Sequence, residues 1–147
     1  MSKELLTGNE IIVRAALNAG AQAFFGYPIT PATEIMAEWD TFYEKNRNNL
    51  LFLQTEDEMS AGFATIGAVV TGKKAFTATA GPGNILMQDA FSMAEAMQIP
   101  IVAIIGQRGG PSTASVIYSQ QELTLTAFGG NGEGYRIVYS PSTIQEL

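Results

Sequence analysis

Two kinds of apolar pattern alternate along this chain, and that alternation restricts its fold more than any other feature. Segments with apolar residues at helical spacing are followed by short runs that are apolar throughout, the pattern of helices and buried strands. Five such strands joined by helices predict an α/β fold, an open parallel sheet with helices on both faces. The expected strands are 21–26, 50–54, 74–79, 100–106 and 135–139.

Capping patterns predict where several helices begin. Thr7 and Glu10 have the spacing of a capping box, and Thr30 followed by Pro31 is typical of an N-cap and a first helical residue. Further helices are expected over 56–71, 84–97 and 120–128, and a second capping box (Ser142 to Gln145) predicts one more. Because the chain ends just inside that last helix, we expect residues 1–147 to be one domain truncated at its C-terminal end.

The chain contains no His and no Cys. Disulfides, thiolate ligands for zinc or iron–sulfur clusters, and Ser-His or Cys-His pairs are therefore excluded. Acid–base chemistry must come from carboxylates, Tyr, Lys or a cofactor. A net charge of −6 without a basic stripe argues against nucleic acid as a partner. No apolar segment approaches the roughly 20 residues of a membrane span, and no signal peptide is present, so a cytoplasmic protein without membrane contact is expected.

Four polar, turn-rich stretches follow the first four expected strands. Since ligands of open parallel sheets bind beyond the carboxyl ends of the strands, these stretches form the expected site. Each also has a purely structural interpretation, as a strand-to-helix turn, an acidic first helical turn or a plain Gly-Pro-Gly turn. The four stretches are 27–31, 55–58, 79–84 and 107–113.

Two charged residues in these stretches are the strongest candidates for chemistry. Glu58 begins a helix rich in Ala and Gly, which packs closely, so its carboxyl should be partly desolvated and its pKa raised. Arg108 is one of only 8 basic residues and follows an apolar strand inside a Gly-rich loop. Its guanidinium is expected either to pair with a neighbouring acid or to clamp the carboxylate of a substrate.

Taken in order, four segments carry a resemblance to a known family. They are Tyr27-Pro28-Ile29-Thr30-Pro31, Glu56-Asp57-Glu58, Thr79-Ala80-Gly81-Pro82-Gly83 and Arg108-Gly109-Gly110-Pro111-Ser112-Thr113. Together they resemble the pyrimidine-binding domain of thiamine diphosphate enzymes. More narrowly, they are similar to the N-terminal part of the alpha subunit of 2-oxoacid:ferredoxin oxidoreductases, and the resemblance covers nearly all of the chain.

The resemblance implies oxidative decarboxylation of a 2-oxo acid with coenzyme A, with two electrons passed to ferredoxin. It implies that Glu58 contacts N1′ of the aminopyrimidine and, by sharing a proton, makes the cofactor's own amine the base. Thr30 would hydrogen-bond the substrate, and Arg108 would bind its carboxylate. The implied cofactor-binding residues beside Glu58 are Pro28, Ile29, Gly81, Pro82, Gly83 and Asn84.

The family's site has a second half, marked by a Gly-Asp-Gly motif, which this sequence lacks. We therefore expect a beta subunit to carry the diphosphate and Mg²⁺ half-site and an iron–sulfur cluster, and no metal site on this chain. Ferredoxin, coenzyme A and the 2-oxo acid are the other expected partners. The Glu-Asp-Glu and Gly-Pro-Gly forms of the motifs favour 2-oxoglutarate slightly over pyruvate as the substrate. Ala114 and the segment 128–132 depart from the family pattern and leave the choice of substrate open.

Two other functions stay open at this point. One is the pyrimidine half of a split thiamine diphosphate decarboxylase, which releases an aldehyde and needs neither coenzyme A nor iron–sulfur clusters. The other is a non-catalytic α/β binding domain in which the acidic turn and the Gly-Pro-Gly turn are structural.

Overall fold

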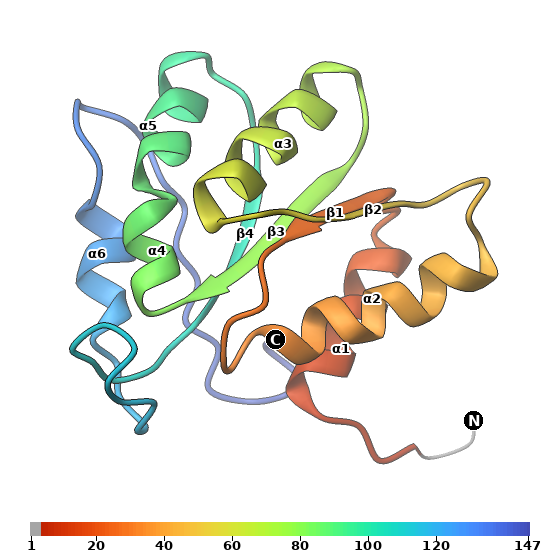
Figure 1. The fold of residues 1–147 in the computed structure, drawn as a ribbon, viewed down its shortest axis with the longest axis horizontal. Helices are drawn as coiled ribbons and strands as arrows, with labels where there is room; N and C mark the ends of the chain where they lie inside the picture. Colours follow the sequence, from red (N-terminus) through yellow and green to blue (C-terminus); the bar gives the residue numbers. More distant parts are fainter. Residues whose placement is uncertain (1–3) are drawn as a thin grey trace.

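Four parallel strands form a single sheet with the order β2-β1-β3-β4 in the computed structural model, which describes residues 4–147 (Figure 1). The central strand β3 is buried along all six of its residues, as expected for a parallel strand covered on both faces. The open parallel α/β sheet is therefore confirmed. The strands are β1 (Ala23–Gly26), β2 (Leu51–Gln54), β3 (Ala75–Ala80) and β4 (Val102–Gly106).

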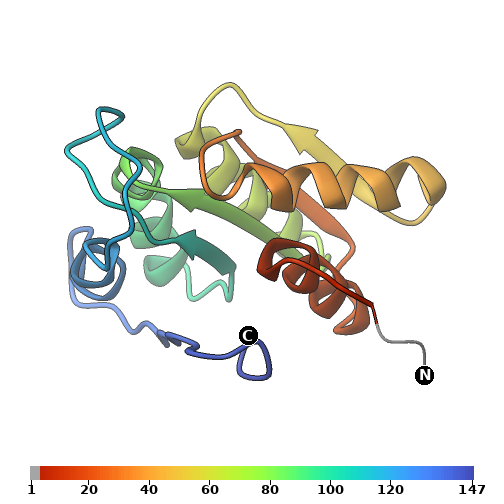
Figure 2. The same cartoon turned by 90° about the horizontal axis from the view of Figure 1, so that it is seen from below.

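Helices cover both faces of the sheet (Figures 1 and 2). One face carries α1 and α2, which pack against each other, and the other carries α3, α4 and α5. A short helix, α6, lies beside α4 and β4. The helices are α1 (Gly8–Asn18), α2 (Thr33–Lys45), α3 (Glu58–Val70), α4 (Pro82–Leu86), α5 (Gln88–Ala96) and α6 (Glu122–Phe128). No helix within residues 4–147 is long and apolar enough to cross a membrane.

An aromatic cluster fixes α2 to the strands that end at the site. Phe24 of β1 is in register with Phe76 of β3, and their rings lie 4.9 Å apart. Trp39 of α2 meets Phe76 edge-on at 5.2 Å, and its indole N–H donates to the carbonyl of Leu51 at 3.1 Å. Each such aromatic pair adds about 0.5–1.5 kcal/mol beyond the burial of its area, so β1 and β3 are held firmly against α2.

The expected strand at 135–139 is wrong. These residues form no ladder with the sheet, and Tyr135, Ile137 and Tyr139 are almost fully exposed. Its aromatic and β-branched composition favours a strand, but such residues form one only where a sheet edge accepts them. The segment is held instead by Arg136, whose guanidinium pairs with Glu95 of α5.

Two expected helix starts are also wrong, while the Thr7 capping box is confirmed. The second helix begins at Thr33, because the Thr30 carbonyl accepts a hydrogen bond from Arg108 instead of starting the helical ladder. The last helix is only a turn, in which the Glu146 carboxylate accepts hydrogen bonds from the backbone N–H groups of Ser142 and Thr143.

Two expected elements differ in extent or position. The helix expected over 84–97 begins earlier, with Pro82 at its first turn, and is divided into α4 and α5 at Met87. The strand expected to be covered on both faces, 100–106, is the edge strand β4, with Val102 exposed. Its continuous apolar run is typical of a central strand. Only the strand order shows that this strand lies at the edge of the sheet instead.

Candidate functional site

The expected site residues meet at the carboxyl ends of β1, β3 and β4. The loop after β1 carries Pro28 to Pro31, the turn after β3 carries Gly81 to Asn84, and Arg108 follows β4. Pro28 and Ile29 are partly buried in their loop, and Thr30 is exposed. Pro31 packs against Gly106, where an added Cβ would come within 3.0 Å of the proline ring. The predicted convergence of these stretches at one sheet edge is therefore confirmed.

Glu58 is a buried acid at the first residue of α3. The N-cap Asp57 accepts a hydrogen bond from the Ser60 N–H at 2.6 Å and so fixes the helix start, and only 4% of Glu58 is exposed. Burial raises the pKa of Glu58; its own backbone N–H opposes this, Asp57 adds to it and Arg108 opposes it more weakly. The expected desolvation is confirmed, and the carboxyl favours its protonated form more than a free glutamate does.

A glycine leaves the space that the Glu58 carboxyl occupies. A Cβ added at Gly83 would collide with Oγ1 of Thr79 and would lie 2.5 Å from Oε1 of Glu58. Oγ1 of Thr79 is buried and has no hydrogen-bond partner within the described residues. A buried acid and a hydroxyl without a partner thus lie together against Gly83, two polar groups of the kind that a bound ligand can satisfy.

The Arg108 guanidinium is held by backbone carbonyls. Nη1 donates to the Thr30 carbonyl at 2.8 Å and Nη2 to the Ser112 carbonyl at 3.0 Å, while Nε is buried without a partner within residues 4–147. The alternative expectation, an ion pair with a neighbouring acid, is not met: no carboxylate lies within 4.0 Å of the Arg108 guanidinium in that part of the chain. Because Arg108 is only 4% exposed, its uncompensated charge and free N–H groups suit an anion such as a carboxylate.

Gly81 brings the turn after β3 directly against Arg108. It has a φ of +53°, and a Cβ there would lie 2.9 Å from Cζ of Arg108. Any other residue would therefore be strained by its backbone and would displace the guanidinium. The sequence pattern predicts a turn at this position, but not that the turn packs on an arginine.

A hollow of about 210 Å³ opens beside Arg108. Its walls are the Gly81-Pro82 turn, the loop Gly109–Ser112 and the start of α6, where Glu122 is the charged lining residue. Complete small-molecule pockets commonly measure about 300–1,000 Å³, so this hollow is smaller than a complete pocket. By itself it does not enclose a ligand of ordinary size.

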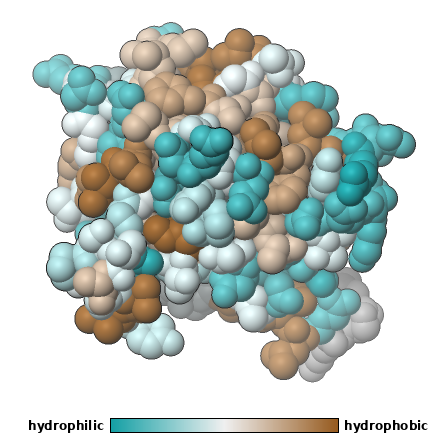
Figure 3. Space-filling view, in the orientation of Figure 1, coloured by the Kyte–Doolittle hydropathy of each residue, from teal (hydrophilic) through white to brown (hydrophobic). Residues whose placement is uncertain are grey.

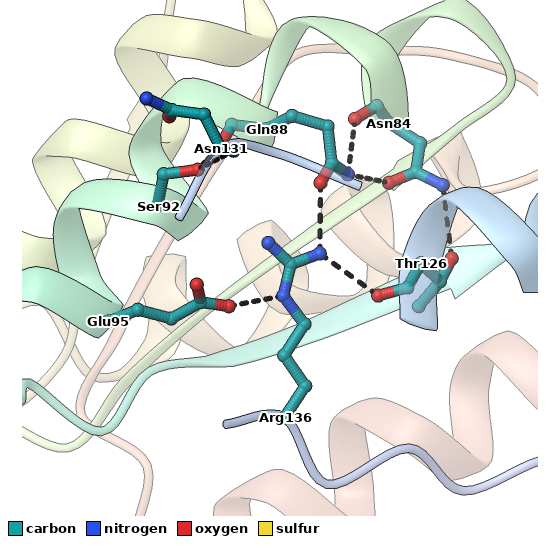
Figure 4. Close-up of polar contacts among 7 residues, drawn as sticks. All are labelled: Asn84, Gln88, Ser92, Glu95, Thr126, Asn131 and Arg136. Atoms are coloured by element: carbon teal, nitrogen blue, oxygen red, sulfur yellow. Dashed lines mark hydrogen bonds and ion pairs between the residues drawn. The ribbon is translucent and has the colours of Figure 1, made fainter. Parts of the chain in front are cut away.

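Asn84 belongs to a polar network with residues of α5 and α6 (Figure 4). It is fully buried, and its Nδ2 donates both to Oε2 of Glu122 at 2.8 Å and to Oγ1 of Thr126 at 3.1 Å. Its Oδ1 accepts from Nε2 of Gln88 at 2.9 Å. The side chain that the resemblance implies for the cofactor pocket is thus engaged with α5 and α6, and its implied contact stays a prediction.

The same network continues to the C-terminal segment (Figure 4). Arg136 donates to Oε1 of Gln88 at 2.9 Å and to the Thr126 carbonyl at 3.1 Å, besides its ion pair with Glu95. The sequence analysis missed both Glu122 and Arg136 as parts of this network. No local motif marks them, because each finds its partner more than 30 residues away.

Residues 14–147 match the family model described as pyruvate flavodoxin/ferredoxin oxidoreductase, thiamine diphosphate-binding. The chain belongs to this family. The recognition of a 2-oxoacid:ferredoxin oxidoreductase domain from its sequence segments is confirmed.

Named relatives agree with this assignment. A 2-oxoglutarate synthase subunit KorA from Methanothermobacter thermautotrophicus is 41% identical over 142 residues, covering 96% of this chain and 37% of the relative. A ketoisovalerate oxidoreductase subunit VorB from Methanothermobacter marburgensis is 32% identical, covering all of this chain and 42% of the relative. The alpha subunit of a 2-oxoacid:ferredoxin oxidoreductase from Aeropyrum pernix is 36% identical, covering 91% of this chain and 22% of the relative.

A solved structure shares the fold. It is a 2-oxoglutarate:ferredoxin oxidoreductase from Magnetococcus marinus with 2-oxoglutarate, coenzyme A and succinyl-CoA bound. It superposes with a TM-score of 0.88 at 36% identity, covering 96% of this chain and 24% of that one. The chain thus spans less than half the length of each of these relatives.

Proposed function

We propose that this chain forms the aminopyrimidine side of a thiamine diphosphate site in an enzyme for coenzyme A-dependent oxidative decarboxylation of a 2-oxo acid, with ferredoxin as the electron acceptor. The observation that carries the proposal is Glu58. It is a buried acid with a raised pKa, and its carboxyl lies in the space left by Gly83. The family's thiamine diphosphate-binding description supports the identity of the ligand.

The residues present fit that cofactor. Thiamine diphosphate, when bound, supplies an acidic C–H group and a ring that accepts the electrons left by loss of CO₂. Glu58 would hold a proton between its carboxyl and N1′ of the aminopyrimidine, a task that suits an acid whose pKa is raised by burial. Gly81, Pro82 and Gly83 would border the ring, with Pro28 and Ile29 contributing from the loop after β1.

Arg108 and Thr30 would bind the 2-oxo acid. Arg108 is braced by two carbonyls, which leaves N–H groups for the substrate carboxylate, and the exposed Thr30 would donate from its hydroxyl. 2-Oxoglutarate is the first substrate to test. The 41% identical relative is a 2-oxoglutarate synthase subunit, whereas the ketoisovalerate relative is 32% identical.

A beta subunit would complete the site with the diphosphate and Mg²⁺ half and an iron–sulfur cluster. Two observations support a further chain or domain at this place: the open hollow, and exposed apolar side chains on α3, α4 and α5. Apolar and polar groups are interspersed over the face drawn in Figure 3. The exposed apolar residues on these helices are Met59, Phe63, Val70, Ile85, Leu86 and Met93.

The test is turnover by the assembled enzyme. With thiamine diphosphate, Mg²⁺, coenzyme A and 2-oxoglutarate, it should reduce a viologen dye, and Glu58→Gln should lower this rate by about 100-fold or more. The matched control is Glu56→Gln, which removes an exposed acid just before α3 and should leave the rate unchanged. Full activity of the Glu58→Gln enzyme would contradict the proposal.

Product analysis separates the proposal from the decarboxylase alternative. The proposed reaction yields an acyl-CoA and a reduced dye, and it stops when coenzyme A is withheld. Release of an aldehyde without coenzyme A or an electron acceptor would instead identify a non-oxidative decarboxylase.

A further inference from the structure

The two loops that surround Arg108 are each tied to the first turn of α6. On one side, Asn84 of the Gly81–Asn84 turn donates to Oε2 of Glu122 at 2.8 Å. On the other side, the Gly110 N–H donates to Oε1 of Gln121 at 3.1 Å. Gln121 and Glu122 are adjacent, so one helical turn bridges both loops across the hollow.

Both bridged loops also contact the guanidinium itself. Gly81 lies so close to Arg108 that an added Cβ would come within 2.9 Å of Cζ, and the Ser112 carbonyl accepts from Nη2 at 3.0 Å. The separation of the two loops therefore sets where the guanidinium lies. Beyond the pairing of Ala80 with Gly106 at the strand ends, the side chains of Gln121 and Glu122 tie the two loops to each other.

Packing alone does not explain a buried glutamate at position 122. It is only 8% exposed, and no cation lies within 4.0 Å of its carboxylate in residues 4–147. Burying a carboxylate without a cation costs free energy, which an amide donor offsets only in part. Its partner Asn84 is fully buried, with both Nδ2 hydrogens and Oδ1 engaged, so this contact is rigid.

We propose that Glu122 and Gln121 are positioning residues for substrate binding: they hold the Gly81–Asn84 turn and the Gly109–Ser112 loop at the separation that orients Arg108. The inference rests on the proposed function, in which Arg108 binds the 2-oxo acid carboxylate. Neither residue needs to touch the substrate. Their effect is transmitted through the two hydrogen bonds to Asn84 and Gly110.

Three variants of the assembled enzyme test this role. Glu122→Ala removes the acceptor for Asn84, Glu122→Gln keeps an acceptor oxygen at the same place, and Gln121→Ala removes the acceptor for Gly110. The matched control is Glu133→Ala, which deletes an exposed acid outside the network. Because Gln121 is exposed, its replacement leaves the core unchanged and keeps the test valid if Glu122→Ala does not fold.

Steady-state kinetics provide the first readout. We expect the KM for the 2-oxo acid to rise about tenfold in Glu122→Ala and Gln121→Ala, the effect of losing one well-formed hydrogen bond beside a charged group. The kcat should change much less, and Glu122→Gln should restore KM to within about twofold of wild type. A merely structural role would lower the active fraction, and hence the apparent kcat, without moving KM.

Hydrogen–deuterium exchange without cofactor or substrate provides the second readout. Backbone amides of 109–112 should exchange faster in Gln121→Ala, and those of 81–87 faster in Glu122→Ala, while Glu122→Gln and Glu133→Ala match wild type. Unchanged KM and unchanged exchange in both alanine variants, with an active wild type, would overturn the inference. An inactive wild type would contradict the proposed function instead.

Discussion

At the scale of single residues, the site depends on an acid whose environment disfavours its charge. Burial raises the pKa of Glu58 above the 4.5 of an unfolded glutamate. The folded protein therefore binds more protons than the unfolded chain between these two pKa values. Stability falls as the pH rises through that interval, because the folded state must then hold a buried carboxylate.

This pH dependence of stability gives a prediction for the Glu58→Gln variant, whose side chain stays neutral at every pH. The variant should gain stability over wild type as the pH rises above about 4.5, reaching a plateau once the folded carboxyl is ionised. Urea unfolding between about pH 4 and pH 8 measures the difference. A stability difference that grows as the pH falls would contradict the assignment of Glu58 as a desolvated acid.

At the scale of helices and strands, α3, which begins with Glu58, approaches α5 closely. A Cβ at Gly62 of α3 would lie 2.5 Å from Cβ of Ala90 on α5. Gly67 of the same helix has no atom within 4 Å of an added Cβ. The two glycines therefore form a matched pair, one required by packing and one replaceable.

Alanine substitutions at these glycines should change stability in opposite directions. Gly62→Ala should destabilise the fold by about 1–3 kcal/mol, because the helices must separate. Gly67→Ala should stabilise it by about 0.5–1 kcal/mol through the better helix propensity of alanine. Urea unfolding of both variants provides the measurement, and an equal effect at the two positions would show that α3 and α5 are not in close contact.

The elements that could be predicted are those with strong local signals. The capping box at Thr7 and the buried run of β3 specify their elements without help from the rest of the chain. The run 135–139 has a strand-like composition, yet its structure depends on the Arg136 contacts with α5, which no local pattern shows. The prediction of an N-cap at Thr30 was wrong for a similar reason. The Thr30 carbonyl accepts a hydrogen bond from Arg108, which lies 78 residues further along the chain.

The candidate site also contains residues that could be predicted from the sequence and residues that could not. Glu58 and Arg108 stand out in the sequence because a charged residue next to apolar or Gly-rich segments is unusual. The desolvation expected of Glu58 is confirmed, and Arg108 is buried as well. The bridge formed by Gln121 and Glu122 could not be predicted, because polar residues at the start of a short helix are common and their partners lie in other loops. The cofactor and substrate roles of the site residues stay predictions.

At the scale of the whole molecule, the proposed function makes this chain one wall of a site. The start of α3 presents an acid and the loop after β4 an arginine, and the hollow between the loops that follow β3 and β4 is too small to enclose a ligand of cofactor size. The absence of His and Cys fits this arrangement. In the proposed enzyme, the cofactor's amine is the base and the partner's cluster carries electrons.

The most direct test of the central claim is the rate at which the C2 proton of thiamine diphosphate exchanges with deuterium in the assembled enzyme, measured by NMR without any 2-oxo acid. This rate reports the proton chemistry of Glu58 independently of the substrate. We predict that Glu58→Gln slows the exchange by about 100-fold or more, while Glu56→Gln leaves it at the wild-type rate. Equal exchange rates in wild type and Glu58→Gln would contradict the account.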